Sequence, residues 1–216
     1  MNKKGKNLKI KNEIVVYNDY KINSLEYIDA LKYDKRTLFQ YYFSLLKTKI
    51  LVLFSFYPND DYNSQIIKIF LFFFSFDLYY TVNALFFTEQ TIHDIYKNSG
   101  KFDFIYHLPQ ILFSSIISSI VNALIKFFSL IQKNILEIKD EKDPNNYKFK
   151  LPKIINCIKI KLFFFFILSF IFLIFFWYYL SCFCAVYRNT QLYLIDDTLL
   201  SFVISLLYPL ILYIFP

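Results

Sequence analysis

The chain has 216 residues, of which 56% are hydrophobic and 22% aromatic, with a formal net charge of +7. This apolar content exceeds that of ordinary soluble domains, so the composition excludes a single water-soluble domain. Phe, Ile, Lys, Asn and Tyr all have AT-rich codons, and we therefore argue from where the lysines lie and not from their number.

Residues 1–36 are predicted to form a basic cytoplasmic tail, because charged and amide side chains dominate there and apolar periodicity is weak. Leu25, Ile28 and Leu31 nevertheless have helical spacing and predict a short helix. A signal peptide needs an apolar stretch of about 7 to 15 residues, which this region lacks. We expect the first spanning helix to act as the insertion signal.

Residues 37–57 are predicted to form an amphipathic segment that lies in the membrane interface. Thr37 and Gln40 have the spacing of a capping box, which starts a helix at the next residue. The polar residues that follow form one narrow stripe on an otherwise apolar helix. The alternative is a re-entrant or spanning segment, which would bury Lys47 and Lys49 at a cost of about 2.5 to 3.5 kcal/mol each.

The rest of the chain, residues 58–216, is predicted to be a membrane domain of four helices. A helix needs about 20 apolar residues to cross a hydrocarbon layer about 30 Å thick. Four stretches meet this length, at about 66–87, 105–130, 160–187 and 198–216. We therefore predict an all-α fold, an integral membrane helical bundle with an N-terminal interfacial helix.

The positions of Lys and Arg predict the orientation of these helices. The segment before the first span holds 11 of them and residues 131–161 hold eight, whereas residues 88–104 hold two and residues 188–197 hold one. Because positive loops stay in the cytoplasm, four spans with both termini cytoplasmic are expected. A fifth span at 38–57 would place the eight-lysine segment outside.

A carboxylate inside the first span, Asp77, indicates a possible polar site. Tyr80 and Thr81 lie one turn further on the same face. Such a residue is costly in lipid and is typical of an ion or proton site, although a neutral aspartic acid hydrogen-bonded in a helix interface is the alternative. Along the membrane normal, Lys126 is expected about 12 Å from Asp77. Its side chain is therefore expected to extend to the membrane surface in preference to forming an ion pair with Asp77.

Ser114, Ser118 and Asn122 repeat every four residues in the second span. Small and weakly polar residues let helices approach and hydrogen-bond, so we interpret the stripe as a packing face, with a pore lining as the alternative. Cys182 and Cys184 are spaced as Cys-x-Cys, for which small packing residues are a better interpretation than a metal ligand pair. We expect no cofactor.

Three stretches resemble uncharacterised multi-pass membrane proteins of AT-rich protist genomes. They are Tyr33-Asp34-Lys35-Arg36, Val82-Asn83-Ala84-Leu85-Phe86-Phe87 and Cys182-Phe183-Cys184-Ala185-Val186-Tyr187-Arg188-Asn189-Thr190-Gln191. The resemblance implies a membrane location and a place at the C-terminal end of longer surface proteins. It implies no known activity.

Without a catalytic constellation, the sequence favours a non-enzymatic membrane protein that acts through helix packing with partners. Those partners are the lipid bilayer, anionic lipids at the lysine-rich face, and other membrane proteins or further copies of this chain. Nucleic acid is disfavoured, because the positive charge follows the membrane topology. The alternative function is a small transporter or channel subunit that uses Asp77.

Overall fold

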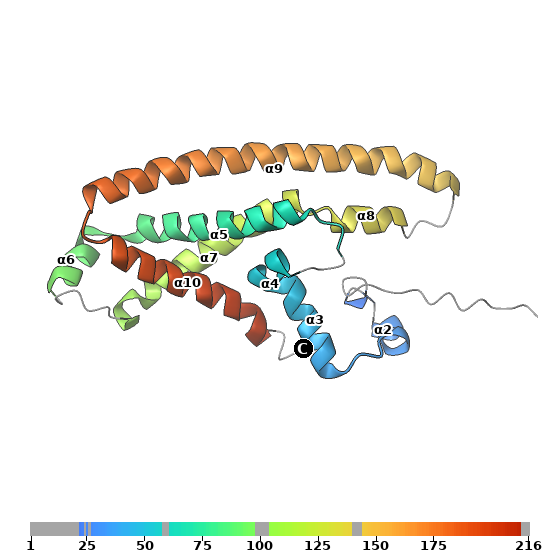
Figure 1. Cartoon of the computed structure of the whole chain (residues 1–216), viewed down its shortest axis with the longest axis horizontal. Coiled ribbons are helices and arrows are strands. Elements are labelled where there is room, and N and C mark those ends of the chain that lie inside the picture. The colour runs from blue at the N-terminus through green and yellow to red at the C-terminus, as the bar shows by residue number, and fades with distance from the viewer. Residues whose placement is uncertain are drawn as a thin grey trace, which may run out of the picture.

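A computed structural model describes residues 22, 23, 25, 27–57, 61–97, 104–139 and 144–212. For Phe104, Tyr106, Pro144, Asn145 and residues 208–212, only the backbone is described. Residues 1–21, which form most of the predicted basic tail, lie outside the described residues, as does the end of the fourth predicted span. Every element within the described part is an α-helix, as predicted (Figure 1).

The helices differ widely in length. In chain order they are α2 (Tyr27–Tyr33), α3 (Leu38–Lys49), α4 (Leu51–Phe56), α5 (Gln65–Phe86), α6 (Glu89–Lys97), α7 (Phe104–Ser129), α8 (Gln132–Lys139), α9 (Pro144–Val186) and α10 (Gln191–Leu212). Figure 1 shows α9 running the length of the molecule, with α5 and α7 beside it. With 43 residues, α9 is about 64 Å long at 1.5 Å per residue.

Among the described residues, three helical stretches are long and apolar enough to cross a membrane. They are Gln65–Phe86, His107–Lys139 and Asn146–Val186. The first is α5, the second comprises most of α7 and all of α8, and the third lies within α9. These stretches contain the first three predicted spans almost completely, because an apolar run of this length has few other stable conformations.

The helix at the fourth predicted span starts earlier than the sequence suggested. It was expected from residue 198, whereas α10 begins at Gln191 and therefore includes Asp196 and Asp197. Both α5 and α7 contact α10, and they also contact each other. Asp197, assigned to a loop in the sequence analysis, thus lies within a helix of the bundle.

Helix α5 lies at the centre of the bundle, because α4, α7, α9 and α10 all contact it. Its buried residues Leu71, Phe74 and Leu78 form one core cluster with Ile125 of α7 and Phe165 of α9. The Phe74 and Phe172 rings meet edge to face, with centroids 6.0 Å apart, a geometry that aromatic rings favour. The many phenylalanines therefore fill the space between long helices.

The segment 37–57 contains two helices instead of one. The predicted capping box is confirmed, since the Thr37 hydroxyl accepts from the Gln40 amide and the Gln40 side chain accepts from the Thr37 amide. The helix then breaks at Ile50, which has extended backbone angles. Leu38 and Phe39 are exposed at the start of α3, whereas α4 packs against α5.

A polar network anchors α3 to the residues before it. The Arg36 guanidinium donates to the Asp34 carboxylate, the Ser44 hydroxyl and the Asn23 amide oxygen, at 2.7 to 2.9 Å. We call these four residues the Arg36 network. The hydrogen bonds from Arg36 lower the pKa of Asp34 below its usual value of 3.8. Ser44 is consequently buried, whereas the sequence predicts it on the polar stripe of the interfacial helix with Gln40 and Lys47.

Candidate functional site

Polar side chains are buried where α5, α7 and α10 meet. In lipid such groups need partners, because hydrocarbon offers no hydrogen bonds. The polar side chains of these three helices that are exposed by less than a tenth include Ser75, Thr81 and Asn83 of α5, His107, Ser114, Ser118 and Asn122 of α7, and Asp197, Thr198 and Ser201 of α10.

The Ser/Asn stripe of α7 belongs to this buried layer. Ser114 and Ser118 are fully buried, and Asn122 is nearly so. The Asn122 side-chain amide donates to the Ser75 hydroxyl of α5 at 2.7 Å, and the Ser114 hydroxyl donates to the Ile111 carbonyl. The stripe therefore lies between helices, where small side chains permit close approach.

Asp77, Tyr80 and Thr81 follow one another along α5 but have different surroundings. Asp77 is half-buried, and no described residue forms a hydrogen bond or ion pair with its carboxylate. Thr81 is buried, and its hydroxyl donates to the Asp77 backbone carbonyl at 2.9 Å. Tyr80 packs against the apolar cluster around Phe183 and Leu194.

Lys126 is not paired with Asp77. It lines a cleft of about 180 Å³ that lies between α3, α4, α5, α7 and α10, and whose lining does not include Asp77. Lys49 of α3 lines the same cleft. The structure thus brings together two lysines that the sequence analysis treated separately.

The buried pair formed by His107 and Asp197 was not predicted from the sequence. His107 Nδ1 lies 3.2 Å from Asp197 Oδ2, and the two side chains are 5% and 0% exposed. The Gln110 amide donates to the same oxygen at 3.1 Å. Nδ1 makes no hydrogen bond with any described residue, so the contact is an ion pair only when the imidazole is protonated.

A second interhelical contact lies one turn along α10 from Asp197. The Asn83 side-chain amide donates to the Ser201 hydroxyl at 2.7 Å and to the Tyr79 carbonyl at 2.9 Å. Asn83 Oδ1 and Asp197 Oδ1 have no hydrogen-bond partner among the described residues. This polar junction therefore joins three helices and retains two buried acceptor oxygens.

One sequence signal could have revealed Asp197. The apolar residues 192–195 precede Asp196 and Asp197 directly, and they extend the apolar run of the fourth span toward its N-terminus. Residues 188–197 were assigned to a loop because the fourth span was predicted to begin at about residue 198. Asp196 is exposed and Asp197 is buried, and this difference arises only when α10 packs against α7.

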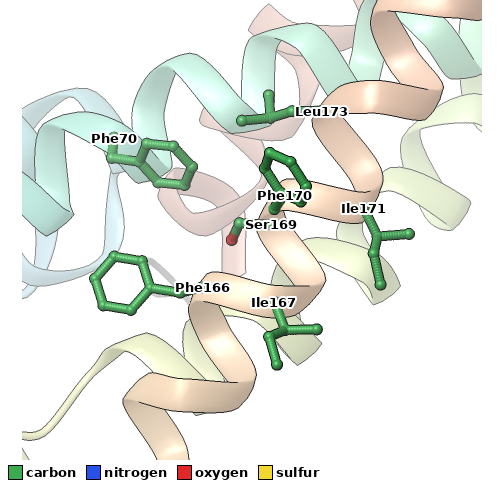
Figure 2. Close-up of a pocket in the computed structure, with 7 residues that line it drawn as sticks. All are labelled: Phe70, Phe166, Ile167, Ser169, Phe170, Ile171 and Leu173. Carbon is green, nitrogen blue, oxygen red and sulfur yellow. The ribbon is translucent and has the colours of Figure 1, made fainter.

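An apolar groove lies between α5 and α9 (Figure 2). Its volume is about 500 Å³, and Figure 2 shows Phe70 of α5 facing Phe166 and Phe170 of α9. The buried Ser169 hydroxyl, which lines the groove, has no hydrogen-bond partner in the described part of the chain. Such a lining suits hydrocarbon and offers little to a polar ligand.

Comparison of the chain with protein-family models, with curated proteins and with solved structures gives no match. The function must therefore be argued from the helices and from the side chains that they bring together.

Proposed function

We propose that this chain is a multi-pass membrane protein that acts through helix packing with partner proteins and not through catalysis. In this proposal α5, α7, α9 and α10 are four spans, and the lysine-rich segments before α5 and at 131–161 lie in the cytoplasm. Support comes from the three long apolar stretches, from the contacts of α10 with α5 and α7, and from the uneven distribution of Lys and Arg.

The outer face of α9 carries the packing proposal. Helix α9 contacts α5, α7 and α8, while large apolar side chains along it remain exposed, including Phe166 and Phe170 at the groove beside α5. Those at helical spacing are Phe163, Phe166, Phe170, Ile174 and Trp177, each more than half exposed. In contrast, the polar side chains of α5, α7 and α10 bond one another inside the bundle. The surface available to a partner within the membrane is therefore apolar and continuous.

Cysteine crosslinking in native membranes tests this proposal. In a variant lacking the native cysteines, we expect Phe170→Cys to form one discrete crosslinked species. Ile120→Cys is the matched control, because Ile120 is equally exposed, at 65% against 66%, but lies on α7. Equal crosslinking at both positions, or a lone monomer in light scattering of the purified protein, would contradict the proposal.

Glycosylation mapping tests the orientation independently. An acceptor tag inserted between α6 and α7 should be glycosylated, and the same tag between α8 and α9 should not be. The reverse pattern would remove the proposed topology, whatever the crosslinking shows.

A second candidate function is proton or cation movement, and the buried pair of His107 and Asp197 favours it. The original basis for this candidate, Asp77, is half-buried. Measuring proton or cation flux in vesicles separates the two carboxylates. Asp197→Asn should abolish the flux if the pair of His107 and Asp197 carries it, and Asp77→Asn should abolish it if Asp77 carries it. Asp196→Asn, which changes an exposed neighbouring carboxylate, is the control. Unchanged flux in all three variants removes the transport candidate.

A further inference from the structure

The cleft between α3, α4, α5, α7 and α10 is lined by cations and by neutral polar groups. Among the described residues that line it, the charged ones are Lys49 and Lys126, and none is a carboxylate. The polar uncharged residues that line it are Ser75, Tyr79, Ser119, Asn122 and Ser205. A cleft with this composition attracts negative charge.

Lys126 has donors to offer to a ligand. Its side chain is half-buried, and its ammonium group makes no hydrogen bond or ion pair with any described residue. A lysine ammonium has three N–H donors and no acceptor. A bound anion would accept hydrogen bonds from these donors.

The neutral polar groups of the cleft supply further donors. Asn122 uses its side-chain amide nitrogen toward Ser75, and that nitrogen has a second N–H. The Tyr79 and Ser119 hydroxyls share one hydrogen bond, with their oxygens 3.3 Å apart, so one of the two O–H groups is left over. The cleft thus presents ammonium, amide and hydroxyl donors together, the set that phosphate oxygens accept from.

We propose that this cleft binds a phosphate group, carried by an anionic lipid or present as free phosphate. A volume of about 180 Å³ equals roughly six water molecules at about 30 Å³ each. It is below the 300–1,000 Å³ typical of sites for drug-sized ligands. Lys126 lies in the last turn of α7, toward the lysine-rich α8. Basic pockets between spanning helices on this side of a membrane bind lipid head groups. The lipid source rests on the proposed membrane insertion.

Binding to the purified full-length chain in a neutral detergent tests the proposal. The probes are inorganic phosphate, dioctanoyl phosphatidic acid and, as a zwitterionic control, dioctanoyl phosphatidylcholine. We expect Lys126→Gln to weaken binding of the phosphate probe at least about tenfold, the effect of losing one charge-assisted hydrogen bond. Lys49→Gln should weaken it about fivefold, as for one lysine near an anionic group.

The matched control is Lys133→Gln. Lys133 is an exposed lysine of α8 that does not line the cleft, so its removal deletes the same charge at the same end of the bundle. Lys49 is itself exposed, and its replacement therefore leaves the packed interior intact even if Lys126→Gln unfolds the protein. Circular dichroism checks the folding of each variant.

The probes distinguish the source of the phosphate. Binding of phosphatidic acid that inorganic phosphate displaces only weakly indicates a lipid head group, whereas equal binding of the two indicates free phosphate. Either result supports the site. The proposal is overturned if neither probe binds, if both cleft variants bind like the wild type, or if Lys133→Gln weakens binding as much as they do. Since these measurements are made in detergent, they can succeed even if glycosylation mapping contradicts the proposed topology.

Discussion

The Lys68 ammonium lies 2.9 Å from the Asp61 carboxylate, and the two side chains are only 2% and 3% exposed. The pair anchors the start of α5, where the Lys68 carbonyl also accepts from the Ser55 hydroxyl of α4 at 2.8 Å. A buried charge is tolerated only when it is paired and hydrogen-bonded. Lys68 therefore acts inside the protein and adds nothing to its positive surface.

Breaking this pair on one side should destabilise the protein strongly. Asp61→Asn leaves the Lys68 ammonium buried without its counter-charge, and we expect the free energy of unfolding to fall by about 3–5 kcal/mol. Combining it with Lys68→Met should restore most of the loss, because no charge then remains buried. Denaturant unfolding in mixed micelles measures both. Glu137→Gln, at an exposed position, is the control and should change the free energy of unfolding little. If Asp61→Asn lowers the free energy of unfolding no more than Glu137→Gln does, Lys68 does not depend on Asp61.

The pair of His107 and Asp197 should respond to removal of the histidine. His107→Phe keeps a ring of similar size but leaves Gln110 as the hydrogen-bond donor to the buried Asp197 within the described part of the chain. We expect a loss of about 1–3 kcal/mol in unfolding free energy, the cost of an unsatisfied buried group. His93→Phe makes the same exchange at an exposed position and should change little. Equal effects of the two substitutions would show that Asp197 does not depend on His107.

Two phenylalanines of α9 distinguish the proposed span from the helix that precedes it. Phe170 and Phe149 are 66% and 75% exposed, but only Phe170 lies within residues 160–187. Phe170→Lys should lower membrane insertion by about 2.5–3.5 kcal/mol, and Phe149→Lys should leave it unchanged. Carbonate extraction of membranes gives the inserted fraction of each variant. Full insertion of the Phe170→Lys variant would place the span elsewhere on α9.

The Arg36 network should weaken in acid. The pKa of Asp34 in the folded protein is lowered, chiefly by its hydrogen bond from Arg36. The ionised carboxylate therefore stabilises the fold at pH values above its unfolded-state pKa of 3.8. That contribution is lost as the pH falls through the lower folded value. Hydrogen exchange of α3, corrected for intrinsic rates, should accelerate below about pH 3.8. Asp34→Asn should accelerate the hydrogen exchange of α3 already at pH 7, whereas Asp29→Asn, at an exposed site, should not. If the two variants show the same dependence of exchange on pH, the prediction is wrong.

Apolar run length predicted the long helices well, since a stretch such as 66–87 must satisfy its backbone internally if it crosses lipid. Helix ends within polar sequence were harder to predict. Helix α9 continues through Pro152 back to Pro144, although an internal proline usually breaks a helix. Pro152 is exposed, so water can satisfy the carbonyl that loses its partner, and proline suits the first helical position at Pro144.

The pairing of polar side chains could not be predicted. The sequence showed that Ser114, Ser118 and Asn122 share one face, because helical spacing alone decides this. Their partners, such as Ser75 for Asn122, depend on how α5 and α7 are placed. The same holds for His107 and Asp197, which come from different helices and approach only when α7 and α10 pack together.

Because α9 is one continuous helix, a change in its tilt would move both of its ends. The part before the proposed span, residues 144–159, adds about 24 Å of rigid rod at 1.5 Å per residue. A change in tilt of about 10°, well within the range seen for spanning helices, would swing its tip by about 4 Å. Lys161 of α9 donates to the Leu130 carbonyl at 3.2 Å, so this swing would pull directly on the joint between α7 and α8.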